Sequence, residues 1–177
     1  MKATGIIRRI DELGRIVIPK EIRKTLRIKE GENLEIFVDE QESIILKKYS
    51  LMQKMNDLAQ DFADAINSFV KYNVFITDND IIMAVSGPLK KTYLNKNISE
   101  ELESKLKRRE EMIEKHPKSI KLTDDKEEVG TYAISPIIVN GDATGLVLIL
   151  SLEDKVDDVC LKISQITSKF LKTHLEQ

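Results

Sequence analysis

The first fifty residues alternate short apolar runs with turn signals, a pattern typical of a small β-rich module. Ile6–Ile10 and Arg15–Ile18 read as two strands separated by a turn at Asp11–Gly14. Pro19 suits the first position of a helix because it has no backbone N–H to satisfy, so a helix is expected from Pro19 to about Leu26. The module ends with a predicted hairpin of two strands, Leu34–Val38 and Ser43–Lys47.

The strand predicted at Arg15–Ile18 carries adjacent β-branched residues, so both of its faces should be covered. A module of about 50 residues usually needs a disulfide, a metal or a partner chain for stability. The single cysteine, Cys160, excludes an internal disulfide, and the two histidines, His116 and His174, have no partner at ligand spacing. We therefore expect no metal, and an obligate twofold dimer formed through residues 1–49.

The rest of the chain predicts an α/β unit framed by two amphipathic helices, at Ser50–Lys71 and from about Glu153 to Leu175. Each helix carries an apolar heptad seam. The seams are Leu51, Met55, Leu58, Phe62, Ala65 and Phe69 in the first helix, and Val156, Val159, Ile163, Ile166 and Phe170 in the last. Two interpretations remain open, since each helix could pack on its own sheet or join subunits in a bundle.

Between these helices the pattern predicts two hairpins and a charged helix from roughly Ser99 to Glu114. The second hairpin turns at Asn140-Gly141-Asp142, a strong turn signal. The predicted strands are Val74–Asp78, Ile81–Val85, Thr131–Val139 and Thr144–Ser151. We assign residues 50–72 to a linking helix and residues 73–177 to a second domain, which makes the chain a two-domain α+β protein.

The charge of the chain is unevenly distributed. The net charge is −2, but residues 1–29 carry nine Lys and Arg against three Asp and Glu. On a helix with 3.6 residues per turn, four of these cations share one arc of about 100°, away from Ile22 and Leu26. They are Lys20, Arg23, Lys24 and Arg27. Local charge and not the mean sets the local potential, so this segment is suited to a polyanion.

The stretches "TGIIRRIDELGRIVIPKEIRKTL", "GENLEIFV" and "IILKKY" resemble the AbrB-type DNA-binding domain of bacterial transition-state regulators over residues 1–49. The resemblance implies a swapped-hairpin dimer that binds double-stranded DNA. It places DNA contacts on Arg8, Arg9, Arg15, Arg23 and Lys24, to which charge alone adds Lys2, Lys20 and Arg27. The family more often has arginine where this chain has Lys24, and lysine gives up bidentate guanine contacts.

Two acidic residues, Asp11 and Glu12, lie beside these arginines and are unfavourable for DNA. We interpret them as residues that cap the turn or orient Arg15.

Residues from about Asn56 to Gln177 resemble a GAF-type sensory domain. The resemblance implies a small-molecule site between the sheet and the loops expected at Ser86–Asn97 and Lys115–Gly130. Four polar residues are candidates for lining it: Ser86, Tyr93, Thr131 and Ser135. Ordinary loop and strand polarity is the favoured explanation for them, and we identify no cofactor. Cys160 is expected to be a packed or surface thiol.

The resulting prediction is a sequence-tolerant transcriptional regulator of sporulation genes, an activator or a repressor, whose GAF-like domain joins dimers into a tetramer. The alternative is an AbrB/MazE-like antitoxin that binds DNA and a toxin partner. No nucleophile–base pair or phosphate loop indicates an enzyme. The longest apolar run has five residues, far below the ~20 that a membrane span needs, so we expect a cytoplasmic protein with no membrane partner.

Overall fold

The computed structural model describes residues 5–40, 42–50 and 52–176. Two of the predicted positions, Lys2 and Leu51, lie outside them. The chain divides into two compact units, Met1–Tyr49 and Ser50–Gln177.

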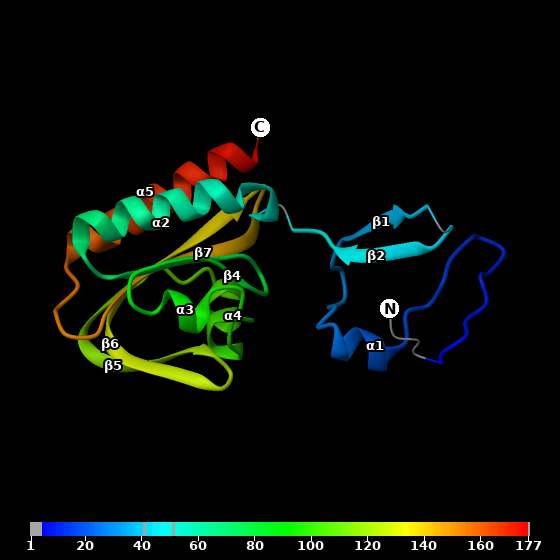
Figure 1. The fold of residues 1–177 in the computed structure, drawn as a ribbon, viewed down its shortest axis with the longest axis horizontal. Coiled ribbons are helices and arrows are strands. Elements are labelled where there is room, and N and C mark those ends of the chain that lie inside the picture. Colours follow the sequence, from blue (N-terminus) through cyan, green and yellow to red (C-terminus); the bar gives the residue numbers. More distant parts are fainter. Residues whose placement is uncertain (1–4, 41, 51, 177) are drawn as a thin grey trace. The chain divides into compact units, whose positions relative to one another are not determined.

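The amino-terminal unit contains one helix and one hairpin (Figure 1). Helix α1 spans Lys20–Thr25, directly after Pro19, as the sequence predicts. Strands β1 (Leu34–Val38) and β2 (Ile44–Lys48) pair antiparallel, with Ile36 opposite Leu46, which confirms the predicted hairpin to within one residue.

The two strands predicted at residues 6–10 and 15–18 are wrong for the single chain, because neither segment joins a sheet there. A strand needs a partner for its backbone N–H and C=O groups, and β1 and β2 pair only with each other. The apolar side chains of these segments are open to solvent: Ile7 is 89% exposed and Val17 is 72% exposed. Among the described residues of this unit, Pro19 is the one residue that is buried.

The carboxy-terminal unit is built on a five-stranded antiparallel sheet in the order β4-β3-β7-β6-β5 (Figure 1). Its strands are β3 (Asn73–Thr77), β4 (Ile82–Ser86), β5 (Met112–Thr123), β6 (Lys126–Val139) and β7 (Asp142–Ser151). The predicted turn between β6 and β7 is confirmed, with positive φ at both Asn140 and Gly141. Two successive positive φ values match the right-handed twist of a hairpin.

Helices cover both faces of this sheet and enclose two apolar cores. A short 3-10 helix, η1 (Met52–Met55), leads into α2 (Asn56–Val70), which lies beside α5 (Asp158–Leu175) on one face. Helices α3 (Lys90–Tyr93) and α4 (Glu100–Lys107) cover the other face. The two sides of each strand serve different cores, so that on β6 Ala133 faces α2 and α5 while Tyr132 and Ile134 face α3 and α4.

The charged helix predicted to reach Glu114 ends at Lys107 in the structure, and the loop predicted at 115–130 is mostly the hairpin of β5 and β6. Strand β5 lies at the edge of the sheet, where many of its side chains meet solvent. Its alternation of apolar and polar residues is therefore short: Ile120 and Leu122 are buried, while the alternating Ser119 and Lys121 are exposed. This weak pattern resembles a loop in the sequence alone.

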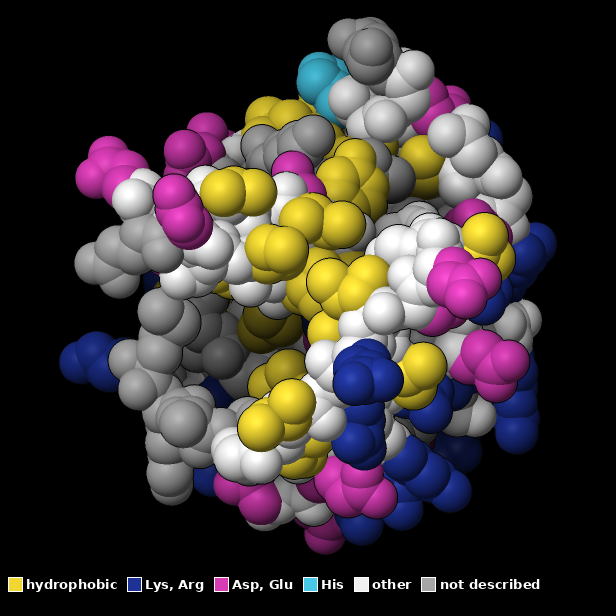
Figure 2. Space-filling model, turned by 90° about the vertical axis from the view of Figure 1, so that its right-hand side faces the viewer, with side chains coloured by type: hydrophobic (Ala, Val, Ile, Leu, Met, Phe, Trp, Pro, Cys, Tyr) yellow, Lys and Arg dark blue, Asp and Glu magenta, His cyan; other side chains and the backbone are white. Residues whose placement is uncertain are grey.

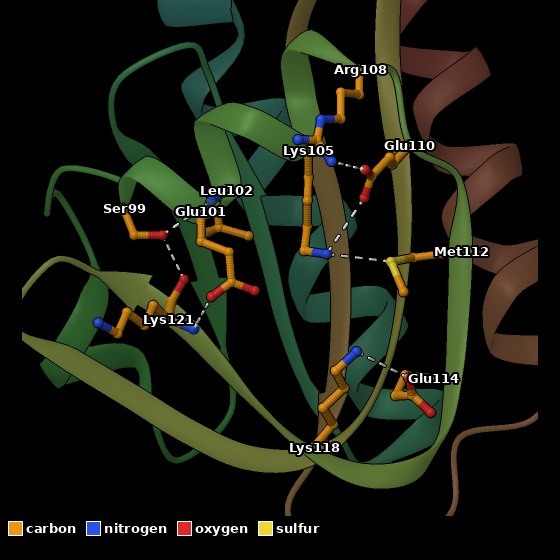
Figure 3. A network of polar contacts seen from close by, with 10 residues as sticks. All are labelled: Ser99, Glu101, Leu102, Lys105, Arg108, Glu110, Met112, Glu114, Lys118 and Lys121. Carbon is orange, nitrogen blue, oxygen red and sulfur yellow. Dashed lines mark hydrogen bonds and ion pairs between the residues drawn. The ribbon is translucent and has the colours of Figure 1, made fainter.

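A polar network fixes α4 against β5 (Figure 3). The Ser99 hydroxyl donates to the carbonyl of Lys121 at 2.6 Å and also accepts from the Leu102 N–H, which caps the helix. The Lys121 N–H in turn donates to the Glu101 carboxylate at 3.1 Å. The two side chains of α4 bond the backbone C=O and N–H of one residue, Lys121, so the start of α4 cannot shift along β5 without breaking hydrogen bonds.

Helix α5 contacts the sheet through small residues. It begins at Asp158, later than the predicted Glu153, because the Asp157 side chain accepts from the Cys160 N–H and caps it. The hydroxyls of Ser164 and of Ser135 on β6 are fully buried and lie 2.8 Å apart. Small hydroxyl side chains at this contact allow the helix to lie close to the sheet.

We predict that Ser135 and Ser164 stabilise the fold as a pair. Each single alanine variant should lower the free energy of unfolding by about 1–3 kcal/mol, because it leaves one buried hydroxyl without this partner. The double variant should cost less than the sum of the two. Chemical denaturation of the four proteins measures the coupling, with Thr173→Ala on the exposed side of α5 as the control. Additive effects would show that the hydroxyls do not act together.

Candidate nucleic-acid interface

The turn at residues 11–15 is organised by the carboxylate of Asp11. Its Oδ1 accepts from the backbone N–H of Leu13 at 3.0 Å and of Arg15 at 2.8 Å. Its Oδ2 accepts from Nε of the Arg15 guanidinium at 2.8 Å. The structure thus confirms that Asp11 both caps the turn and orients Arg15. For Glu12 it shows an exposed side chain and gives no such role.

These contacts also set the ionisation of Asp11. The backbone N–H of Arg15, followed by its guanidinium, lowers the pKa of the carboxyl below its ordinary value. Asp11 therefore stays charged at neutral pH. One of its oxygens holds the turn and the other holds the guanidinium, so the direction of Arg15 is tied to the backbone conformation.

The basic residues around this turn are distributed over two elements. Arg8, Arg9 and Arg15 are exposed in the segment before α1, and a terminal nitrogen of Arg8 donates to the carbonyl of Ile7 at 3.2 Å. Lys20 and Lys24 are exposed on α1, and Arg23 is half-buried there. In the described part of this unit, cations are therefore exposed to solvent both in the segment before α1 and on α1 itself.

Arg27 does not belong to the helical arc on which the sequence placed it. Helix α1 ends at Thr25, and Arg27 follows its C-cap with a φ of 53°. Its carbonyl accepts from Nζ of Lys48 at 2.7 Å, which ties the end of the helix to β2. The prediction was wrong because it extended helical geometry by two residues beyond the end of the helix.

Apolar residues of the same unit are exposed next to these cations. Hydrophobic side chains form an open group on the face shown in Figure 2, with Lys and Arg side chains gathered beside it. Those of the amino-terminal unit include Ile7, Ile10, Val17, Ile36, Val38 and Ile44. An exposed apolar surface of this extent marks an interaction site.

The structure does not bring the four candidate pocket residues of the second domain together. The hydroxyl of Thr131 donates to the Asp154 carbonyl and accepts from the Val156 N–H, so it supports the chain that enters α5. Ser135 bonds Ser164 under the same helix, and Ser86 lowers the pKa of Asp64 on α2 through a hydrogen bond. All three lie on the α2–α5 side of the sheet.

Tyr93 lies on the opposite side, fully buried in the core under α3 and α4. Its hydroxyl donates to the Glu128 carboxylate on β6 at 2.6 Å. Burial and this carboxylate raise the pKa of Tyr93, so the phenol remains a hydrogen-bond donor at neutral pH. Glu128 was missed as a partner because the sequence placed it in a loop.

Three further observations concern the described part of the chain. Cys160 is buried, and desolvation raises the pKa of its thiol, which fits the packed thiol of the prediction. No group of three or more His, Cys, Asp or Glu side chains in that part could hold a metal ion. Within it, every helix is too short or too polar to cross a membrane.

Comparison with known families gives two matches that cover different parts of the chain. Residues 54–176 match the model of the stage V sporulation protein T C-terminal, transcription factor. Residues 7–54 match the model of antidote-toxin recognition MazE, bacterial antitoxin. The first match spans more than half of the chain.

Individual proteins agree with this division. Stage V sporulation protein T of Bacillus subtilis is 47% identical over 178 residues, which covers 100% of both chains. Transition state regulatory protein AbrB of the same organism is 65% identical over 49 residues, which are 28% of this chain and 50% of AbrB. The cofactor-binding GAF domain of the nutrient sensor CodY from Clostridium difficile shares the fold, with a TM-score of 0.51 and 11% identity over 70% of this chain and 92% of that domain.

The carboxy-terminal model and the full-length relative agree over nearly all of the unit that carries the sheet. The GAF neighbour confirms the predicted α+β fold of that unit. The chain therefore belongs to the stage V sporulation protein T family of transcription factors.

Proposed function

We propose that this protein is a DNA-binding transcriptional regulator of sporulation that acts in the cytoplasm and contacts double-stranded DNA through Arg8, Arg9, Arg15, Arg23 and Lys24. The observation that carries the proposal is the Asp11–Arg15 contact, which holds a guanidinium in a fixed direction on an exposed turn. A guanidinium held in this way can reach a guanine edge as a bidentate donor. The amino-terminal likeness to AbrB over 49 residues supports the same function.

The other cations fit the role of phosphate ligands. Lys20 and Lys24 extend from α1 as exposed point charges, which bind phosphate without reading sequence. Family resemblance supports Lys24, whereas Lys20 and Arg27 are supported by charge alone. A mixture of few base contacts and many phosphate contacts favours a loose sequence preference.

We infer that residues 1–49 act as a dimer. Pro19 is the single buried residue among those described in this unit, and many of its apolar residues are exposed, so these residues form no core of their own. Neither segment 6–10 nor segment 15–18 joins a sheet in the single chain. Strands of a second copy can therefore pair with their backbone N–H and C=O groups. A swapped hairpin would cover the apolar surface and pair these backbones in one step.

The second domain supports a further association of dimers into a tetramer. On α2 and α5 the small residues face the sheet, as at Ala59, Ala63 and Ser164, and are buried. Part of each seam faces outward: Phe69, Val159, Ile166 and Phe170 are exposed, whereas Met55 and Val156 are buried in the core. Phe62 and Phe170 join the two helices, with ring centroids 4.6 Å apart. Two adjacent helices with one apolar outer surface fit the same surface of a second copy as a bundle.

Small-molecule sensing by the GAF-like unit is part of the proposal, with the ligand unassigned. The side that GAF domains use is occupied here by the core under α3 and α4, where Tyr93 and Glu128 are hydrogen bonded. A ligand could act only by favouring one arrangement of this layer over another.

The antitoxin alternative rests on the MazE match to residues 7–54. The following residues form a folded two-core unit that matches the sporulation model, which favours the regulator. Purification of a small toxin bound to the full chain would support the alternative.

The first prediction concerns the DNA contacts. Arg15→Ala should weaken binding to a duplex by about 1–3 kcal/mol, and Arg15→Lys should not restore it because lysine lacks the planar fork. Lys24→Ala should weaken binding evenly across sequences. If about eight cations per dimer meet phosphate, the slope of log K against log salt should be about −7.

Fluorescence anisotropy at several salt concentrations measures these changes. Arg108→Ala is the control, since Arg108 is an exposed arginine of the other unit, with an ion pair to Glu110. Unchanged affinity in both Arg15→Ala and Lys24→Ala would contradict the proposed interface.

The second prediction concerns Asp11. Because its pKa is lowered in the folded protein, its contribution to the turn is complete above the ordinary carboxyl pKa of roughly 4. The contribution is lost as the pH falls through the lowered value. The amide resonances of Leu13 and Arg15 should therefore titrate together at a pH below that of a free aspartate. Asp11→Asn should abolish the titration and reduce DNA affinity, and titration at an ordinary pH would show that the contacts do not form in solution.

The third prediction concerns assembly. Ile166 is 66% exposed on the outer surface of α5, and replacing it with glutamate should convert a tetramer into a dimer without unfolding the chain. Val129→Glu is the matched control, since Val129 is 58% exposed on β6 of the same unit. Native mass spectrometry of the full chain should give four chains for the wild type and the control and two for Ile166→Glu. A monomeric wild type would contradict both interfaces.

A further inference from the structure

A hydrogen bond lies at the point where the carboxy-terminal unit begins. Ser50 is the first residue of that unit, directly after the last residue of the DNA-binding module. Its hydroxyl donates to Oδ2 of Asp78 at 2.9 Å. Asp78 follows the end of β3 and is 3% exposed. The chain is thus held, where it enters this unit, by a side chain that is itself part of the folded interior.

Asp78 needs donors because a buried carboxylate has lost its water. Two of them come from its own turn: the N–H groups of Asp80 and Ile81 donate to Oδ1 at 2.7 Å and 2.6 Å. Burial raises the pKa of Asp78, and the three hydrogen bonds oppose the rise. The donor to Oδ2 is Ser50, so the turn and the entering chain depend on one another.

The same turn is bonded on its other side to the segment between α3 and α4. The Asp80 carbonyl accepts from the Ile98 N–H at 2.8 Å, and Ile81 forms a bridge with Asn97. The Ile82 N–H donates to the Lys96 carbonyl at 2.8 Å. Ile98 is fully buried in the core under α3 and α4. Hydrogen bonds therefore run without a break from this core, through the turn at Asp78, to Ser50.

We propose that the Ser50–Asp78 hydrogen bond is a latch that couples the α3–α4 layer to the attachment point of the DNA-binding module. With the latch closed, the module is tethered at Ser50. When residues 96–98 are displaced, the turn loses its hydrogen bonds to them and Ser50 is released, which lengthens the free tether as far as the buried Met52. A longer tether lowers the effective concentration of one DNA module near its neighbour. This inference rests on the proposed function, because it assigns that regulator a route from its sensory layer to its DNA modules.

The test compares full-length Ser50→Ala with the wild type by amide hydrogen exchange, with no DNA present. Loss of one hydrogen bond should raise exchange about fivefold at Asp80 and Ile81, and also at Ile98, which does not touch Ser50. Ser50→Thr keeps a hydroxyl and should exchange like the wild type. Ser68→Ala is the matched control, because the Ser68 hydroxyl bonds only locally, to the Ala65 carbonyl on α2.

A second measurement uses two duplexes of the same mixed sequence, one long enough for a single dimer and one twice that length. Ser50→Ala should leave affinity for the short duplex unchanged and reduce the advantage of the long duplex by at most about fivefold, the factor that one hydrogen bond can supply. Faster exchange confined to Asp80 and Ile81, or an unchanged ratio of affinities, would overturn the latch. If no protein binds either duplex, the proposed function fails, while exchange at Ile98 still decides whether the coupling exists.

Discussion

The constraint on which the protein depends is that its first 49 residues cannot bury their own apolar side chains. Ile7 and Val17 lie open in the single chain, and no cysteine or metal cluster compensates in the described part of this unit. Burial of apolar area is the main favourable term in folding, so we infer that a second copy supplies the missing stability. The cations lie on the same short segments. Association would therefore place the arginines of both copies on one dimer. The module would then fold and form its DNA-binding surface in the same step.

The carboxylate of Asp11 restricts the motion of the Arg15 side chain. A negative charge beside the arginines proposed to bind DNA weakens their attraction to phosphate, yet the same carboxylate fixes both the turn and the Arg15 guanidinium. A fixed guanidinium loses less conformational entropy on binding than a free one. The electrostatic cost is acceptable because the surrounding segment holds a large excess of cations. The turn therefore fixes the direction of the Arg15 guanidinium in addition to presenting its charge.

The elements that depend on a short stretch of sequence were predicted correctly. Pro19 marked the start of α1, the apolar runs marked β1 and β2, and Asn140-Gly141 marked the β6–β7 turn. What depends on other parts of the fold was missed. Strand β5 has its polar residues on a sheet edge, the segments 6–10 and 15–18 have no partner within one chain, and Tyr93 pairs with Glu128 from a strand read as a loop. The candidate pocket residues were also separated by the fold, because Tyr93 on α3 belongs to the core opposite the one that Ser86, Thr131 and Ser135 face.

The heptad seams of α2 and α5 left two interpretations open, and the exposure of part of each seam supports the proposed bundle. Packing on the sheet is done by a different stripe, made of small residues such as Ala59, Ala63 and Ser164. Of the seam residues that the structure describes, Met55 and Val156 are buried in the same core, while Phe69 and Ile166 remain exposed. One helix surface therefore stabilises the domain while the other stays available for a second copy. Substitutions on the outer surface can change assembly without loss of the fold, which allows the two interfaces of the protein to be separated experimentally.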